Sequence, residues 1–454
     1  MSDQTNLQSS NRVGFHYFQD QNHFREKDLA VWLPELKSLG ASWLVLQANL
    51  NCAIPEYFLS SLLENQIQPI LFAPMLNQQP PSLEEVKPIF TAYSHWGARY
   101  IILADRPNDR SMWPSSAWAQ EELVERFLDH YLPLANLALQ EGLKPILPPL
   151  TPGGNYWDTA FLRSLLESLT RRRQTMVLDQ LILSAYCWTH QQHLNWGAGG
   201  PERWPAVKPY QTRDEEDHRG FRIFDWYQAI AQAATGQETP IILLQAGASG
   251  VTAASHPATD PAVVSQAILQ NLFNHPVNDP HLEDLTLEPI PQSVKACNFW
   301  LLSEDANGLN QAYAWYPAVG NPSPIVGLCQ EMAAKSSAET VAAEKALPEL
   351  LKAEFYQKDE QPARQRPIRH YLLLPLQEWG VADWHLEVVK PYIRKHRPTV
   401  GFSLKEAVLA EKVTVIGNEE SFPEKVLNHL RSAGCFVERI QGDGTTIATL
   451  LAER

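Results

Sequence analysis

Short apolar runs of strand length alternate with longer amphipathic segments from residue 13 to about residue 310. This alternation is typical of a parallel β/α architecture. The segments between the runs have helical periodicity, for example Lys27–Leu39 and Glu121–Glu141, and glycines such as Gly40 and Gly142 follow the ends of helices. The eight predicted strands are Val13–Phe18, Trp43–Gln47, Pro69–Pro74, Tyr100–Asp105, Pro145–Leu150, Leu181–Cys187, Pro240–Ala246 and Val294–Leu302.

The number of β/α units favours a closed (β/α)8 barrel, the TIM fold, over an open doubly wound sheet. An open sheet of this length usually carries a glycine-rich phosphate loop after its first strand. Here the first strand is followed by Gln-Asp-Gln-Asn-His-Phe, which contains no glycine. The open sheet remains the alternative.

The composition changes after Pro324 to a stretch rich in Ala, Glu, Lys and Ser, followed by a polar, proline-bearing segment at residues 358–367. A second β/α series then runs to the C-terminus, which predicts a small α/β domain with a parallel, Rossmann-like sheet. We therefore expect four parts: an N-terminal tail (1–12), the barrel (13–335), a helix and linker (336–368) and the small domain (369–454).

Overall composition restricts the classes of partner. The chain has 454 residues, of which 44% are hydrophobic and 19% charged, so it is globular. Its net charge of −14 argues against nucleic acid and anionic membranes as partners. The five cysteines are scattered without a CxxC pair, which argues against a zinc site or a disulfide framework. No motif for a cofactor was found, and we expect none.

The first residues, Met-Ser-Asp-Gln-Thr-Asn, lack the basic and apolar regions of a signal peptide. No apolar run approaches the ~18 residues of a membrane span. The expectation is a soluble, cytoplasmic protein by default, with the cell surface as the alternative if another export route exists.

The fourth strand carries the most informative motif, because catalytic groups of such barrels lie at the C-terminal ends of strands. It reads Ala104, Asp105, Arg106, Pro107, Asn108, and Trp113 follows. This frame resembles the clan A retaining glycoside hydrolases, whose fourth strand ends in Asn-Glu-Pro with a Trp shortly after. The resemblance extends by pattern over residues 13–310 and implies a barrel that binds an oligo- or polysaccharide.

Two departures from that family concern the catalytic carboxylates. The resemblance places Arg106 at the acid/base position and Gln245 at the nucleophile position. A guanidinium does not donate a proton at neutral pH, and a carboxamide is a poor nucleophile. We therefore predict a glycan-binding barrel that has lost retaining hydrolysis. The alternatives are an active glycoside hydrolase that uses Asp105 and a structural or assembly protein of the cell surface.

Candidate ligand contacts are polar and aromatic residues near the strand ends, where indole faces suit sugar rings. Seven of the 14 tryptophans lie in or near these predicted regions, at positions 113, 118, 157, 188, 196, 204 and 300. The predicted substrate-binding residues are His16, Tyr17, Gln47, Arg106, Asn108, Trp113, Tyr186, Trp188, Gln245, Trp300 and Glu304. Because an unpaired cation is costly at a barrel mouth, we expect Arg106 to pair with Asp105, Glu304, Asp305 or an acidic sugar.

The predicted loop Thr189–Arg222 carries His190, His193 and the acidic run Asp214–Asp217. Without an HExxH motif or an obvious third ligand, the two histidines are interpreted as hydrogen-bonding or solvated groups and no metal is predicted. The acidic run is interpreted as a solvated loop, with calcium or glycan hydroxyls as its alternative ligands.

The C-terminal segment resembles one unit of the cell-wall-binding repeats of bacterial surface proteins. The matched positions are Val413, Val415, Gly417, Val437, Arg439, Ile440, Gly442 and Thr446. The second glycine of that motif is Asn418 here, and Asp443–Thr445 replace its Arg-Tyr-Glu stretch. The resemblance implies a surface polymer as partner, whereas the simpler interpretation is a domain that packs on the barrel or mediates self-association.

Overall fold

The structure is a computed structural model that describes residues 11–75, 81–207, 217–248, 260–280, 282, 284–318, 320–336, 368–375, 383–419 and 421–452. It separates into a barrel unit, Ser10–Ala343, and a C-terminal unit that contains Glu344–Arg454. Most of the predicted tail 1–12 and of the predicted linker 336–368 lies outside the described residues.

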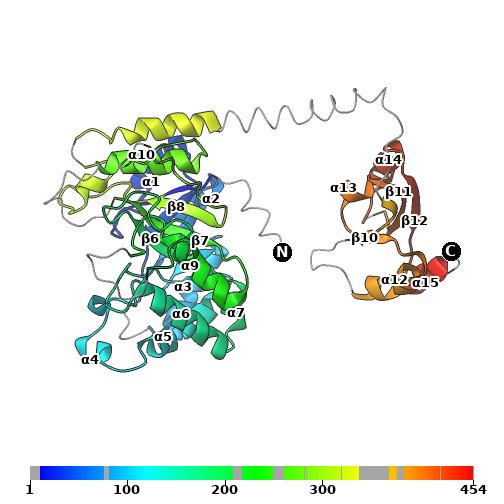
Figure 1. The fold of residues 1–454 in the computed structure, drawn as a ribbon, viewed down its shortest axis with the longest axis horizontal. Coiled ribbons are helices and arrows are strands. Elements are labelled where there is room, and N and C mark those ends of the chain that lie inside the picture. Colours follow the sequence, from blue (N-terminus) through cyan, green and yellow to red (C-terminus); the bar gives the residue numbers. More distant parts are fainter. Residues whose placement is uncertain are drawn as a thin grey trace. The chain divides into compact units, whose positions relative to one another are not determined.

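Figure 1 shows the barrel unit as a ribbon. It contains eight parallel strands in one sheet, ordered β5-β4-β3-β2-β1-β8-β7-β6. The strands are β1 (Val13–His16), β2 (Trp43–Gln47), β3 (Gln68–Phe72), β4 (Tyr100–Ile102), β5 (Lys144–Ile146), β6 (Leu183–Trp188), β7 (Ile241–Gly247) and β8 (Val294–Phe299). Between β5 and β6 the Leu147 amide donates to the Ile182 carbonyl at 2.9 Å, next to the strand ends. This hydrogen bond connects the two end strands of the sheet, β5 and β6, and the predicted eight-stranded barrel is confirmed.

Helices follow the strands in the expected alternation. The longer ones are α1 (Glu26–Ser38), α2 (Glu56–Glu64), α3 (Leu83–His95), α5 (Leu123–Gln140), α6 (Asp158–Arg171), α9 (Ile223–Thr235) and α10 (Pro261–Leu272). Short pieces are α4 (Ser115–Trp118), α7 (Thr175–Asp179), α8 (Gly200–Arg203) and the 3₁₀ turns η1 (Arg110–Met112) and η2 (Gln311–Tyr313). A last helical segment covers residues 325–336. The helix α3 begins with a capping box, in which the Ser82 hydroxyl accepts from the Glu85 amide.

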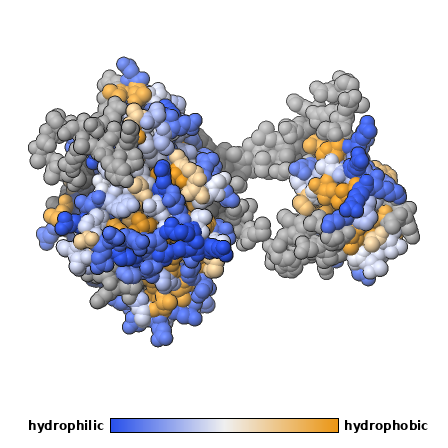
Figure 2. Space-filling model, turned by 60° about the horizontal axis from the view of Figure 1, so that its bottom comes forward, coloured by the Kyte–Doolittle hydropathy of each residue, from blue (hydrophilic) through white to orange (hydrophobic). Residues whose placement is uncertain are grey.

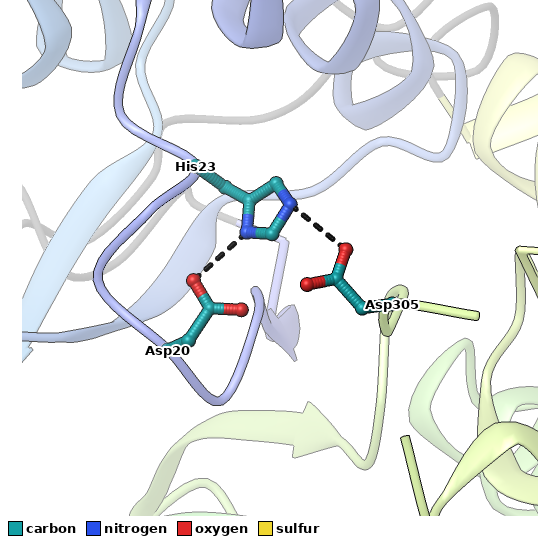
Figure 3. A group of neighbouring side chains, drawn as sticks. All are labelled: Asp20, His23 and Asp305. Carbon is teal, nitrogen blue, oxygen red and sulfur yellow. Dashed lines mark hydrogen bonds and ion pairs between the residues drawn. The ribbon is translucent and has the colours of Figure 1, made fainter. Parts of the chain in front are cut away.

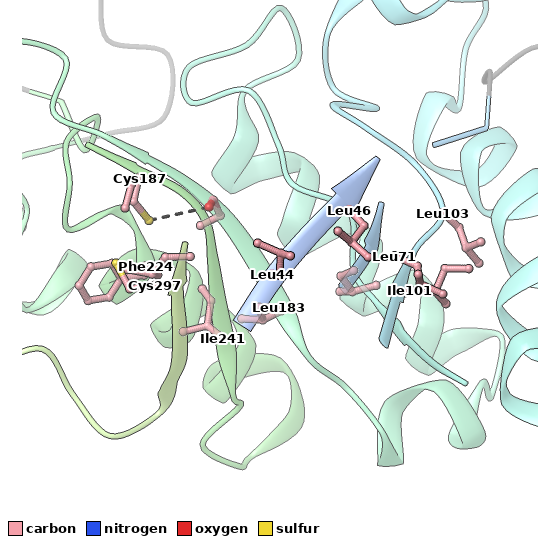
Figure 4. Packing of buried hydrophobic residues seen from close by; sticks show 14 of the residues in the cluster. Leu44, Leu46, Leu71, Ile101, Leu103, Leu183, Cys187, Phe224, Ile241 and Cys297 are labelled. Atoms are coloured by element: carbon pink, nitrogen blue, oxygen red, sulfur yellow. Dashed lines mark hydrogen bonds between the residues drawn. The ribbon is translucent and has the colours of Figure 1, made fainter. Parts of the chain in front are cut away.

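Alternate strand residues pack outward against the helices. Leu44 and Leu46 of β2 belong to the same buried cluster as Phe224 of α9 (Figure 4). The alternate residues of β2, Trp43 and Val45, face the barrel interior, because successive strand side chains point to opposite faces. The ring of Trp43 lies 5.5 Å from that of Tyr100 on β4.

The C-terminal unit is a four-stranded parallel sheet in the order β10-β9-β11-β12, which confirms the predicted small α/β domain. The strands are β9 (Ile368–Leu373), β10 (Thr399–Gly401), β11 (Ala410–Ile416) and β12 (Phe436–Ile440). The helices are α12 (Asp383–His396), α13 (Leu404–Ala407), α14 (Glu424–Ser432) and α15 (Gly444–Ala452). Residues of α13 and α14 share one buried cluster with the sheet, and residues of α12 and α15 share a second.

Within the described residues, no helix is long and apolar enough to span a bilayer. Figure 2 shows hydrophilic residues over much of the visible face, interrupted by separate apolar areas. Several large apolar side chains of the C-terminal unit are exposed, namely Val400, Phe402, Leu404, Leu409 and Phe436.

Candidate functional site at the barrel mouth

The C-terminal ends of the strands bring polar and aromatic residues to one end of the barrel. His16 ends β1, Gln47 ends β2 and Tyr186 lies on β6. Asp105 follows β4, and Trp300 follows β8 directly. Because all eight strands are parallel, these ends form a single mouth.

Asp105 is the centre of a hydrogen-bonded group at this mouth. The Tyr186 hydroxyl donates to Asp105 Oδ1 at 2.7 Å, and Arg106 Nε donates to Asp105 Oδ2 at 2.9 Å. Asp105 is only 8% exposed. Burial raises the pKa of Tyr186 well above its usual value, and the adjacent Asp105 carboxylate raises it further. Tyr186 therefore acts as a neutral donor that fixes the carboxylate.

Arg106 is a partly exposed cation beside Asp105. Its backbone has a φ of +43°, in the left-handed region, and its amide donates to the Pro149 carbonyl at 3.0 Å. Its side chain is 37% exposed, and only Nε is paired among the described residues, so both terminal Nη groups are open. Burial alone would lower the pKa of Arg106, but the charge and hydrogen bond of Asp105, together with Tyr186 and Asp109, outweigh burial, so the net pKa is raised. The expected partner is thus Asp105, through one hydrogen bond rather than a bidentate pair.

Gln245 reaches the mouth through an irregularity in β7. Against β6, Ala185 pairs with Leu243 and Tyr186 pairs with Gln245, so Leu244 is an extra residue. Such a bulge changes the direction of the side chains that follow it. Ala246 then packs outward in the core, which leaves Gln245 on the inner side next to Tyr186.

Aromatic rings surround the polar group. The rings of Tyr186 and Trp188 are stacked with centroids 4.9 Å apart, and Trp188 remains partly exposed. His16 lies edge to face with Trp300 at 4.9 Å, and Trp300 is also partly exposed. Burial lowers the pKa of His16 to about 3, which keeps its imidazole neutral. Its Nε2 atom is buried and has no hydrogen-bond partner among the described residues.

The carboxylates after β8 are engaged in loop contacts. Glu304 Oε2 accepts from the Asn310 amide at 2.6 Å, and Glu304 Oε1 accepts from Gln19 at 3.3 Å. Gly308 allows this fold, because a Cβ there would lie 2.1 Å from the Glu304 carboxyl carbon. Glu304 thus ties its own loop to the loop after β1.

His23 makes a second link between the same two loops (Figure 3). Its Nδ1 lies 2.9 Å from Asp20, and its Nε2 lies 3.3 Å from Asp305. These three residues are the group within the described chain whose donor atoms could approach a metal. The two ring nitrogens of His23 face different carboxylates, Asp20 and Asp305. The three side chains therefore connect the two loops instead of converging on one metal position.

Three predicted ligand contacts lie in the packed interior. Tyr17 is fully buried and its hydroxyl donates to the His23 carbonyl. Asn108 is also fully buried. Its side-chain amide donates to the Thr151 carbonyl and accepts from the Thr151 backbone amide, both at 2.9 Å. Trp113 donates to the Pro107 carbonyl at 2.8 Å and is 6% exposed. In this conformation Tyr17 and Asn108 have no surface available for a ligand, and Trp113 has little.

The loop between β6 and α9 is held by ring and polar contacts within the loop and by hydrogen bonds to the segment 279–288. The ring of His193 lies edge to face with Trp196 at 5.6 Å, and the ring of His190 lies 5.9 Å from Trp188. Asp217 accepts from the Arg219 amide at 2.7 Å. The remainder of the predicted acidic run, residues 214–216, lies outside the described residues.

A buried polar group beneath this loop has no sequence signal. His218 Nε2 lies 2.9 Å from Asp158, and Tyr227 donates to the same carboxylate at 2.7 Å. Burial opposes the charge of Asp158, but His218 and the other hydrogen bonds lower its pKa on balance. Asp158 is 60 residues from His218 and 69 from Tyr227, and no motif connects the three, so only the fold brings the carboxylate to its partners.

No protein family and no curated protein sequence matches this chain. Among solved structures, it resembles a glucosidase from Croceicoccus marinus at 12% identity and a TM-score of 0.42, over 66% of this chain and 61% of that one. It also resembles Saccharomyces cerevisiae Gas2p in complex with laminaripentaose, at 11% identity and a TM-score of 0.41, over 71% of this chain and 64% of that one. A third similar structure is a GH128 endo-β-1,3-glucanase from Sorangium cellulosum, at 11% identity and a TM-score of 0.36, over 70% of this chain and 97% of that one. The chain thus spans less than two thirds of the first two proteins. This likeness concerns the barrel fold.

Proposed function

We propose that the barrel mouth binds an oligo- or polysaccharide and does not catalyse retaining hydrolysis. The observation that carries this proposal is the position of Arg106 and Gln245 at the strand ends where the resembled family has glutamates. Partly exposed Trp188 and Trp300, together with the open Arg106 guanidinium, provide stacking surface and hydrogen-bond donors for a sugar.

Asp105 is poorly suited to replace the missing acid. Both of its oxygens accept hydrogen bonds, one from Tyr186 and one from Arg106. This environment suits an acceptor-only carboxylate, whereas a general acid must carry a proton and point it at the leaving oxygen. Retaining hydrolysis also requires a second carboxyl group about 5 to 5.5 Å away, and the nucleophile position holds Gln245.

The direct test is titration of the full chain with laminaripentaose, cellopentaose, xylopentaose and mannopentaose, followed by calorimetry and tryptophan fluorescence. We expect saturable binding of at least one of them and no turnover of aryl glycosides. Turnover that disappears in Asp105→Asn would establish the active-hydrolase alternative. Absence of binding to neutral and acidic oligosaccharides alike would refute the proposal.

For the C-terminal unit we propose self-association, an assembly role that leaves the barrel free to bind. Exposed Phe402, Leu409 and Phe436 support this, because large apolar side chains at a surface favour association. Arg439, one of the positions that match the repeat, donates to the Phe422 carbonyl and lies 3.2 Å from Glu424. Its guanidinium therefore contacts other residues of the same domain. Analytical ultracentrifugation of the wild type and of Phe436→Ser measures their oligomeric states and tests this role. A monomeric wild type would exclude it.

A further inference from the structure

An open cavity lies beside the mouth, between the loop after β1 and the end of β2. Its volume is about 390 Å³, within the usual range for small-molecule sites. The described lining residues are Gln21, Asn22, Phe24, Arg25, Gln47, Ala48, Asn49, Cys52, Ala53, Ile54, Pro55 and Tyr57. Nothing in the sequence pattern indicates this cavity, except that Gln47 ends a strand.

Amide side chains dominate the polar part of this lining. Asn49 donates to Gln21, and its carbonyl oxygen accepts from the Asn51 and Cys52 amides at 2.8 and 2.7 Å. Gln21 also donates to the Ala48 carbonyl at 3.3 Å. These bonds fix two of the amides as a rigid wall of the cavity.

Gln47 differs from those two amides. It is the last residue of β2, on the inward side by the alternation of that strand, and it is half-buried. Gln47 lines the cavity, and within the described part of the chain its carboxamide has no hydrogen-bond partner, so its donors and its acceptor are not used inside the protein. A carboxamide offers two donors and an acceptor, which match adjacent hydroxyl groups, since each hydroxyl both donates and accepts.

The charge of the lining narrows the class of ligand. Among the described lining residues there is no carboxylate, and Arg25 is the one formal charge. A protonated amine would find no counter-charge here and would be repelled by Arg25. Phe24, Ile54 and Tyr57 add apolar surface, and Tyr57 is 39% exposed. An uncharged polyhydroxyl group with an apolar face fits this combination.

We infer that this cavity holds one neutral sugar unit of the bound glycan, with Gln47 hydrogen-bonding two neighbouring hydroxyls. The inference rests on the proposed glycan-binding function and extends it from the mouth to a defined subsite. It assigns specificity to the β1 and β2 loops, independently of Asp105 and Arg106.

The cavity contains its own reporter group. All five cysteines lie within the described residues, and Cys52, on the cavity wall, is the exposed one. Cys187, Cys297 and Cys329 are buried, and burial raises the pKa of Cys297 and of Cys329 to about 12. A thiol reagent will therefore modify Cys52 selectively. Its rate of alkylation in the native chain measures whether the cavity is occupied.

The experiment combines this rate with affinity. Whichever of laminaripentaose, cellopentaose, xylopentaose and mannopentaose binds the wild type should, at saturation, slow Cys52 alkylation by iodoacetamide at least about tenfold. Gln47→Met should raise the Kd for that oligosaccharide about three- to tenfold, because hydrogen bonds are lost while side-chain length is kept. The matched control is Gln292→Met, an exposed glutamine just before β8 at the opposite end of the barrel.

The outcomes separate the two claims. Binding with an unchanged alkylation rate, and with equal affinities in Gln47→Met and Gln292→Met, would overturn the subsite and leave the proposed function intact. If the Gln47 variant is misfolded by circular dichroism, the alkylation rate of the wild type decides alone. If none of the four sugars binds or protects Cys52, the neutral-sugar subsite fails, and acidic oligosaccharides then decide the proposed function.

Discussion

At the scale of single residues, the mouth shows how Arg106 and Tyr186 together determine the role of Asp105. With Arg106 beside it, Asp105 accepts a hydrogen bond from that guanidinium and another from Tyr186. The carboxylate thus positions a cation. The Nη groups of that cation, which are open among the described residues, are the donors most available to a ligand.

Arg106 should contribute to ligand binding through its charge if the glycan carries carboxylates. We expect Arg106→Gln to weaken binding of trigalacturonate about tenfold or more and to change binding of neutral oligosaccharides about threefold or less, since charged hydrogen bonds are the stronger ones. Added salt should weaken only the uronate complex. Calorimetry at two salt concentrations measures both effects. Equal affinities for both sugars in both proteins would show that Arg106 does not contribute to binding.

His16 should make the barrel less stable in mild acid. Its pKa of about 3 in the folded chain lies below the ordinary 6.5, so below pH 6.5 the unfolded chain binds a proton that the folded chain does not. Stability is therefore lost as pH falls from 6.5 toward 3, by at most about 5 kcal/mol in all and about 2 kcal/mol by pH 5.

Urea unfolding of the barrel at pH 7 and pH 5 measures this difference. Between pH 7 and pH 5 the free energy of unfolding should fall by about 2 kcal/mol more in the wild type than in His16→Gln. His95→Gln, an exposed histidine at the end of α3, is the control and should behave as wild type. Parallel losses in all three proteins would show that His16 is already protonated in the folded state or accessible to water.

At the scale of elements, the strands are specified locally and the contacts between them are not. The alternation in β1 places Gly14 and His16 inward and Val13 and Phe15 outward. At Gly14 the interior is so close that a Cβ would lie 2.3 Å from Asn298 Oδ1 and 2.7 Å from the Trp43 Cβ. Glycine is therefore required by two neighbouring strands rather than by its own backbone.

Gly14→Ala should destabilise the barrel by about 1 to 3 kcal/mol, because the interior must shift to admit a methyl group. Gly327→Ala is a suitable control, since Gly327 is exposed in the helical segment 325–336 and a Cβ there meets nothing within 4 Å. That substitution should be neutral or stabilising by up to about 1 kcal/mol. Thermal and urea unfolding measure both, and a neutral Gly14→Ala would mean that β8 yields at Asn298.

At the scale of the whole molecule, each unit has a core of its own. The buried cluster of the barrel contains residues from β1 to the helical segment 325–336. The C-terminal unit has two clusters, one on each side of its four-stranded sheet, and Tyr371 and Leu372 of β9 point into different ones. Each unit thus meets the basic requirement for independent folding.

We expect separately expressed fragments 10–343 and 344–454 each to unfold cooperatively in urea. The barrel fragment should bind oligosaccharides with the Kd of the full chain, because every residue assigned to the site and subsite lies within it. Any self-association should be retained by the C-terminal fragment. A barrel fragment that folds but binds more weakly would show that the C-terminal unit contributes to the site.

The sequence by itself determined the architecture and the chemistry available at the strand ends. Strand periodicity and flanking glycines are local properties, so the eight barrel strands, with small shifts of their ends, and the later β/α series could be predicted. The predicted strand Tyr100–Asp105, for example, is Tyr100–Ile102 in the structure, because the chain leaves the sheet before the left-handed turn at Arg106. The identities of Asp105, Arg106 and Gln245 at the strand ends also followed from the sequence alone.

Only the tertiary structure decided which of these residues lie at the mouth and which are buried. Tyr17 and Asn108 are polar residues near strand ends, yet closure of the barrel buries both. Gln245 reaches the mouth through a bulge, and Tyr186 meets Asp105 from a position 81 residues away. The amide-lined cavity arises where two loops converge. Burial, bulges and cavities depend on which distant segments the closed barrel brings together, and local pattern carries no information about that.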